Sequence, residues 1–130
     1  MKVYIAAPWP YRDKAITVMR MLETKKVHVT SRWLKAEHKA VSELTIDEQA
    51  AFAREDLDDV LEADLLLALN PEGWEDKGTG GRHVELGYAI AHGKPVILAG
   101  ERTNVFHYLP SIKRIDDSED IVKHVQKALS

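Results

Sequence analysis

Short apolar runs alternate along the chain with longer segments in which apolar residues recur every three or four positions. The short runs have the length of buried strands and lie at residues 2–7, 26–30, 65–69 and 96–99. The periodic segments lie at residues 13–24, 45–62 and 84–91, and their spacing predicts helices. Further on, the KRI run at 113–115 predicts an edge strand, and Asp117 or Ser118 is expected to cap a last helix that ends at Leu129.

Because strands alternate with helices and each strand is short and apolar, the sequence predicts an α/β fold in three layers. We expect one domain over residues 1–130, with a parallel five-stranded, flavodoxin-like (Rossmann-like) sheet and helices on both faces. In such sheets, ligands bind at the C-terminal ends of the strands. Residues 7–9, residues 70–71 and the loop that leads to Glu85 are therefore expected to converge on one crevice.

The predicted helix at 45–62 carries an acidic residue where an apolar one is expected. Thr45, followed three residues later by Glu48, is a capping-box pattern at its start. Asp56 falls inside the apolar stripe, where a carboxylate is unfavourable unless it is hydrogen-bonded or used in chemistry. From the pattern alone, both a structural and a functional role are open for Asp56. The spacing predicts a buried stripe of Ala53, Leu57, Val60 and Leu61, and an exposed side of Glu55, Asp58, Asp59 and Glu62.

A second carboxylate, Glu85, lies in the first turns of a helix that follows a glycine-rich loop. A glutamate at this place often only complements the positive end of the helix dipole. The backbone N–H groups of Gly80 and Gly81, with Arg82 beside them, suit either a bound phosphate or carboxylate or a simple hinge. The loop has neither the G-x-G-x-x-G pattern of dinucleotide sites nor a Walker A sequence.

Composition limits the classes of function that remain. With 45% hydrophobic and 30% charged residues, the chain has the composition of an ordinary soluble globular protein. A net charge of −3 argues against a nucleic-acid or anionic-membrane surface, so small molecules are the expected partners. There is no cysteine, no G-x-S-x-G elbow and no histidine spacing typical of a metal site. No signal peptide or membrane span is recognisable, so we expect a cytoplasmic location.

Three segments carry a resemblance to a known family. VYIAAPW, REDLDDVLEADLLLAL and GRHVELGYAIAHGKPVIL together resemble the nucleoside 2-deoxyribosyltransferase family, including its branch of 2'-deoxynucleoside 5'-monophosphate N-glycosidases. The similarity covers most of the chain, in the same order. Its most specific part is ELGYA followed by Gly-Lys-Pro at the start of a strand. The aspartate that precedes Ala-Asp and the apolar run is a second, independent match.

The resemblance implies an activity and three catalytic residues. Glu85 takes the place of the nucleophile, Tyr4 that of the tyrosine that orients it, and Asp56 that of the aspartate that contacts the sugar or assists proton transfer. The implied reaction cleaves the N-glycosidic bond of a 2'-deoxynucleoside through a covalent deoxyribosyl-glutamate and transfers the sugar to another base. Hydrolysis of a 5'-monophosphate is the alternative, and a non-catalytic nucleotide sensor is a second one. None of these reactions requires a cofactor or metal.

The residues expected to contact substrate match the family pattern less closely than the three catalytic residues do. The family has glycine where this chain has His83, and an aspartate where it has Thr79, so that Asp76 is the nearest acidic replacement. Asn104 loosely matches an asparagine that a neighbouring subunit supplies in the transferases, which implies a homo-oligomer. Among the loop tryptophans 9, 33 and 74, Trp9 is the best candidate to stack on the base. The expected substrate contacts are Trp9, Asp76, Gly80, Gly81, Arg82, His83 and Asn104.

Overall fold

Five parallel strands form one sheet in the order β2-β1-β3-β4-β5. The computed structural model describes residues 1–36, 43–74, 77–117 and 119–130. This arrangement confirms the predicted flavodoxin-like sheet. The strands are β1 (Lys2–Ala6), β2 (His28–Val29), β3 (Leu65–Asn70), β4 (Val96–Gly100) and β5 (Ile112–Ile115).

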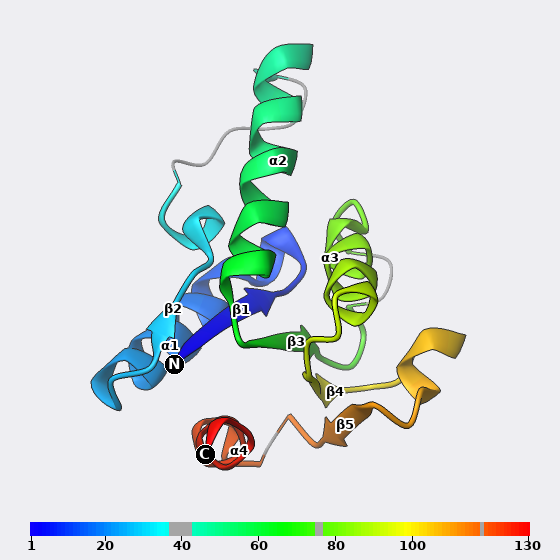
Figure 1. Ribbon diagram of the computed structural model, residues 1–130. Helices are drawn as coiled ribbons and strands as arrows, with labels where there is room; N and C mark the ends of the chain where they lie inside the picture. The colour runs from blue at the N-terminus through cyan, green and yellow to red at the C-terminus, as the bar shows by residue number, and fades with distance from the viewer. Residues whose placement is uncertain (37–42, 75–76, 118) are drawn as a thin grey trace.

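Helices cover both faces of the sheet, as the alternation of elements predicts (Figure 1). The helices are α1 (Arg12–Thr24), α2 (Ile46–Glu62), α3 (Gly81–Ala91) and α4 (Ile121–Leu129). Side chains of α1 and α4 pack in one core cluster, and those of α2 and α3 in another. Within the described residues, none of the helices combines the length and apolarity needed to cross a bilayer. Among the described residues, short 3-10 turns include η1 (Trp9–Tyr11), η2 (Arg32–Lys35) and η4 (Val105–Tyr108).

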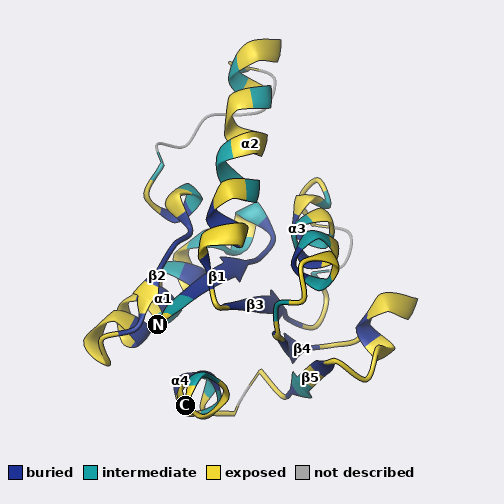
Figure 2. Ribbon diagram, viewed as in Figure 1, coloured by how far each residue is buried: buried dark blue, intermediate teal, exposed yellow. Residues whose placement is uncertain are grey.

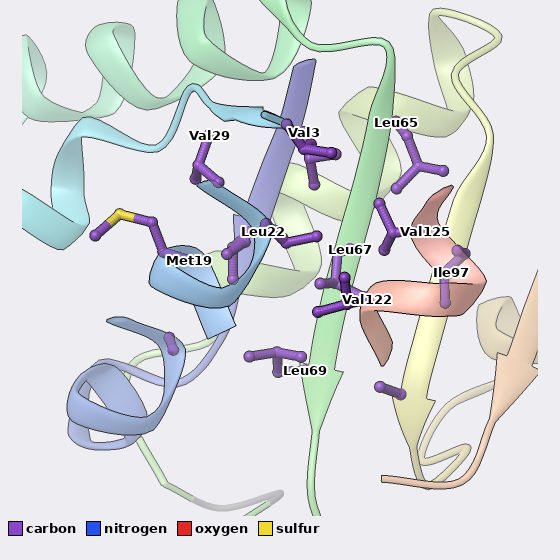
Figure 3. Close-up of a cluster of buried hydrophobic side chains, with 14 of the residues drawn as sticks. Val3, Met19, Leu22, Val29, Leu65, Leu67, Leu69, Ile97, Val122 and Val125 are labelled. Carbon is purple, nitrogen blue, oxygen red and sulfur yellow. The ribbon is translucent and has the colours of Figure 1, made fainter. Parts of the chain in front are cut away.

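The alternation of side chains along β1 assigns each residue to one of the two cores. Val3 and Ile5 join the cluster under α1 and α4, part of which Figure 3 shows. Tyr4 and Ala6 point to the opposite face and pack with α2 and α3. All four side chains are buried. Buried residues are dark blue in Figure 2, and much of the sheet has this colour. Tyr4 is therefore placed on the α2/α3 side of the sheet by the period of the strand alone.

The order of the strands sets where the crevice lies. From β1 the chain passes through α1 to β2, and from β3 it passes through α3 to β4, so the two connections leave in opposite directions. Sheets of this type bind ligands between such strands, at their C-terminal ends. Ala6 pairs with Ala68, so β1 and β3 end at nearly the same level. The turn after β1 and the loop after β3 therefore border the same edge.

Two details of the helices differ from the sequence prediction. Ala53 and Leu61 of α2 are exposed, whereas Asp59 is buried. Figure 1 shows the N-terminal part of α2 extending beyond the sheet, and Figure 2 shows this part largely exposed, which accounts for Ala53. The last helix is capped by Asp120, whose Oδ1 accepts from Lys123 N at 3.1 Å, instead of by Asp117. Ser118 lies outside the described residues.

Gly100 marks the closest approach of backbone at this edge of the sheet. Its φ is +123°, and a Cβ atom placed on it would lie 2.1 Å from the carbonyl oxygen of Asn70. We expect Gly100→Ala to lower the free energy of unfolding by at least about 2 kcal/mol, because the ends of β3 and β4 must move apart. Urea denaturation of the purified variant measures this change.

Gly87→Ala is the matched control, because no atom lies within 4 Å of a Cβ at this position on α3. It should raise the stability by roughly 0.5–1 kcal/mol through helix propensity. Equal effects of the two substitutions would show that the backbone contact at Gly100 is unimportant.

Candidate active site

A hydrogen bond between β1 and α3 lies at the centre of the candidate site. The hydroxyl group of Tyr4 donates to Oε2 of Glu85. Gly80, with φ of 84°, is the N-cap of α3, and this left-handed conformation starts the helix so that Glu85 reaches the sheet in its second turn. Tyr4 is fully buried. The Glu85 carboxylate is therefore directed inward, and complementing the helix dipole does not account for its position.

Burial of these groups changes their protonation. Burial raises the pKa of Glu85 to about 8; the hydrogen bond from Tyr4 opposes this rise, and the charges of Asp56 and Asp59 add to it. Burial, and after it the charges of Asp59 and Glu55, raise the pKa of Asp56 to about 6, while Arg32 opposes this rise. The Tyr4 pKa is raised, first by burial and then by Glu85, so Tyr4 remains a donor. Near pH 7 the two carboxyl groups hold roughly one proton between them.

Asp59, which sequence reasoning placed on the exposed side of α2, is a buried member of this region. Its two carboxylate oxygens accept hydrogen bonds from Arg32: Oδ2 from the backbone N–H at 3.0 Å and Oδ1 from Nε at 2.9 Å. Arg32 Nη2 is also 2.8 Å from Oδ1. No pattern within α2 predicts this burial, because the partner comes from a segment 27 residues away. In the sequence, the available signal is a basic residue two positions after a predicted strand.

Two tryptophans pack together at the C-terminal end of β1. The ring centroids of Trp9 and Trp33 are 5.8 Å apart, and Trp33 Nε1 donates to Ile5 O at 2.9 Å. Trp33 contacts both core clusters, which places it at the end of the strand between the two faces of the sheet. The sequence prediction singled out Trp9. The structure adds Trp33 as a half-buried aromatic wall at the same place.

The glycine-rich loop comes close to this aromatic pair. Gly78 packs against the backbone of Pro8 and Trp9. A Cβ atom placed on Gly78 would lie 3.7 Å from Pro8 Cα and 3.6 Å from Trp9 N. Arg82 is buried, and its guanidinium group donates to Lys77 O at 3.0 Å and Trp74 O at 3.2 Å. These bonds hold the loop against α3. Gly81 begins the helix and is exposed, so backbone at this helix start is accessible.

His83 and Asn104 lie in a different part of the structure. His83 lines a small pocket with Asn70 and His107, between α3 and the ends of β3 and β4, and its ring is 5.7 Å from that of His107. Asn104 caps η4 through Oδ1, which accepts from Phe106 N at 3.0 Å. Asp76 lies outside the described residues. The structure thus brings Tyr4, Asp56 and Glu85 together, with Trp9 and the glycine-rich loop at the same edge, and places His83 and Asn104 beside β4.

Over the described ranges, no group of three or more histidine, aspartate or glutamate side chains is arranged to hold a metal ion.

Stability should depend on pH through Glu85. Because its folded-state pKa is raised above the ordinary value of 4.5, the contribution of Glu85 to stability is present in full below that value and is lost as pH rises towards about 8. Glu85→Gln has no such loss. We therefore expect the free energy of unfolding of the variant, relative to that of the wild type, to rise by on the order of a few kcal/mol between about pH 5 and about pH 8. Urea denaturation of both proteins at the two pH values tests this, and parallel pH dependences would contradict it.

Comparison with known proteins identifies the family. A family model described as nucleoside 2-deoxyribosyltransferase matches residues 3–123. Among solved structures, a 2-deoxyribosyltransferase from Bacillus psychrosaccharolyticus is 21% identical, with a TM-score of 0.67 and 95% of each chain covered. The CMP N-glycosidase BcmB of Clostridium botulinum is 20% identical, with a TM-score of 0.62 and 100% of both chains covered.

A conserved protein from Enterococcus faecalis V583 is 19% identical, with a TM-score of 0.65 and 98% of each chain covered. No curated protein gives a significant match. The similar structures share the fold, and the family model extends over nearly the whole sequence. The chain belongs to the nucleoside 2-deoxyribosyltransferase family, a family of enzymes.

Proposed function

We propose that this enzyme cleaves the N-glycosidic bond of 2'-deoxynucleosides and transfers the deoxyribosyl group to another nucleobase. The observation that carries this proposal is the Glu85 carboxyl group, which accepts a hydrogen bond from the buried Tyr4 and whose pKa is raised by burial and by the charge of Asp56. A fold has little use for two interacting carboxyl groups at a ligand-binding edge, since their burial is unfavourable. A nucleophile and a proton carrier need this arrangement.

The higher pKa of Glu85 places the shared proton mainly on Glu85 in the free protein. In the first step this proton moves to Asp56 as substrate binds, so that Glu85 acts as the carboxylate. A Glu85 oxygen forms a bond to C1' as the bond from C1' to the base nitrogen breaks, through an oxocarbenium-like transition state. The electron pair of the broken bond stays on the base nitrogen, and the proton of Asp56 neutralises the leaving base. Tyr4 donates to the Glu85 oxygen that does not attack, and this hydrogen bond fixes the rotamer of the Glu85 side chain. The product of this step is a deoxyribosyl ester of Glu85.

In the second step, a nitrogen of an incoming base attacks C1' and the ester bond breaks. The attacking base gives its N–H proton to Asp56, and Glu85 is released as a carboxylate. Attack by water in place of a base would give free 2-deoxyribose, so transfer and hydrolysis differ only in what reaches the intermediate. We place Trp9 against the flat face of the base at the end of β1.

A 2'-deoxynucleoside 5'-monophosphate N-glycosidase is the second candidate function. The accessible start of α3 at Gly80 and Gly81 favours it, because backbone N–H groups at a helix N-terminus suit a phosphate. The fold is also shared with a CMP N-glycosidase. A non-catalytic nucleotide sensor is the third candidate, and the raised proton affinities of Glu85 and Asp56 argue against it.

A homo-oligomer in cytoplasmic nucleoside salvage is the setting that we propose for the reaction. The 3-10 turn η4, which follows Asn104, exposes apolar side chains: 61% of Phe106 and 68% of Tyr108 are accessible. Exposed aromatic residues in a cluster commonly mark a protein interface. We propose that a second copy of the chain covers this surface and that Asn104 approaches the partner's substrate there.

A substrate panel distinguishes the candidate functions. We expect deoxynucleosides incubated with an acceptor base to give new deoxynucleosides, resolved by chromatography. Free base with 2-deoxyribose 5-phosphate from monophosphates would instead assign the protein to the glycosidase branch. Absence of turnover on every member would contradict both enzymatic candidates.

The same panel tests the role of Glu85. Glu85→Gln should lower kcat by about 10³-fold or more, because the nucleophile is removed while the shape of the site is kept. Glu23→Gln, which changes an exposed carboxylate on α1, is the matched control and should keep full activity. Full activity of Glu85→Gln would rule out the proposed mechanism.

Assembly is tested by sedimentation of the purified protein. We expect a dimer or larger oligomer at micromolar concentration, and we expect Phe106→Asp to shift it towards monomer because the charge would be buried in the interface. Met21→Asp, at another exposed apolar side chain, on α1, is the control and should leave the assembly unchanged. A monomeric wild type, or an oligomer that Phe106→Asp does not weaken, would contradict the proposed interface.

A further inference from the structure

Asp59 is a buried carboxylate close to the catalytic groups. It follows Asp56 by three residues on α2, so the two side chains lie on the same side of the helix, one turn apart. Only 7% of the Asp59 side chain is exposed. A buried charge at this distance acts on its neighbours through a medium of low dielectric. Asp59 accordingly raises the pKa of Asp56, after burial, and adds to the raised pKa of Glu85.

Arg32 satisfies this carboxylate from outside the helix. Its backbone N–H, Nε and Nη2 all bond to Asp59, so both carboxylate oxygens have partners. The segment that carries Arg32 is itself fixed. Thr30 Oγ1 donates to Asp59 O at 2.8 Å, and Arg12 Nη2 donates to Leu34 O at 2.9 Å and Ala36 O at 2.6 Å. The guanidinium group therefore faces Asp59 from an ordered backbone.

The titratable and charged groups around Asp56 come from four elements. Glu55 and Asp59 lie on α2 itself, Glu85 on α3, Tyr4 on β1 and Arg32 on η2. Of the described groups that shift the pKa of Asp56, Arg32 is the only cation. Arg32 also lies 3.7 Å from Glu55, measured from Nε to Oε1. One arginine thus opposes the acidic groups on this side of the site.

We propose that Arg32 is a positioning residue for the reaction. By binding both oxygens of Asp59, it offsets part of the buried charge beside Asp56 and so sets the pH range in which Asp56 exchanges its proton. This inference rests on the proposed role of Asp56 in proton transfer. Arg32 does not touch the reacting atoms in this account. It acts through Asp59, whose charge is felt by Asp56 and Glu85.

Opposite substitutions should move the activity in opposite directions. Arg32→Gln leaves the Asp59 charge uncompensated, so Asp56 and Glu85 hold their proton to higher pH and the optimum of kcat/KM moves up. Asp59→Asn removes the charge, so the optimum moves down. We expect each shift to be about half a pH unit to one unit. A residue with a merely structural role would lower the rate in both variants without moving the optimum.

The experiment records kcat/KM from about pH 5 to about pH 9 for the wild type, Arg32→Gln, Asp59→Asn and Arg32→Lys. Arg32→Lys keeps the positive charge but loses the planar guanidinium group that makes several hydrogen bonds to Asp59. Its pH optimum of kcat/KM should therefore stay near that of the wild type, with a lower rate. Shifts in opposite directions for Arg32→Gln and Asp59→Asn support the proposal. Unmoved optima, or shifts in the same direction, overturn it.

A titration without substrate separates this proposal from the proposed function. The side-chain carboxyl signals of ¹³C-labelled protein are followed by NMR, and the Asp56 signal is assigned by its loss in Asp56→Asn. The Asp56 midpoint should rise in Arg32→Gln and fall in Asp59→Asn, even if the wild type turns over no substrate. If Arg32→Gln fails to fold, the comparison of Asp59→Asn with Arg32→Lys decides: an Asp56 midpoint that does not fall in Asp59→Asn overturns the proposal.

Discussion

The hydrogen bond from Tyr4 to Glu85 joins strand β1 to helix α3, and the site depends on this one contact. The period of β1 points Tyr4 to the α2/α3 face, and the left-handed Gly80 starts α3 where Glu85 meets it. A carboxyl group buried in this way is unfavourable unless a donor satisfies it. The fully buried hydroxyl group of Tyr4 supplies that donor, and its raised pKa keeps the proton in place.

The electrostatics of the crevice follow from the same burial. Glu85 and Asp56 have raised pKa values, about 8 and about 6, and share roughly one proton near neutral pH. The ion pair between Asp59 and Arg32 limits how far the acidic cluster is protonated, and it ties the segment after β2 to α2. That segment also supplies Trp33, which packs against Trp9. The segment after β2 therefore contributes both to the wall of the crevice, through Trp33, and to its charge, through Arg32.

Much of this arrangement was predictable from the sequence, because local patterns determine it. Short apolar runs with intervening helices gave the parallel sheet, the capping box at Thr45 located the start of α2, and Asp56 stood out within an apolar stripe. Contacts between distant segments were not predictable in this way. The burial of Asp59 requires Arg32, and the position of Trp33 requires the carbonyl group of Ile5. The exposure of Ala53 follows from α2 extending past the sheet, which its own periodicity does not encode.

The central claim is that Glu85 becomes covalently bonded to the sugar. Mixing the protein with a deoxynucleoside, quenching with acid within one turnover and analysing the digested peptides by mass spectrometry tests this claim most directly. We expect a deoxyribosyl adduct on the peptide that contains Glu85, and no adduct in Glu85→Gln. Turnover with an adduct on a different residue, or with no adduct under conditions where a matched ester survives the quench, would contradict it.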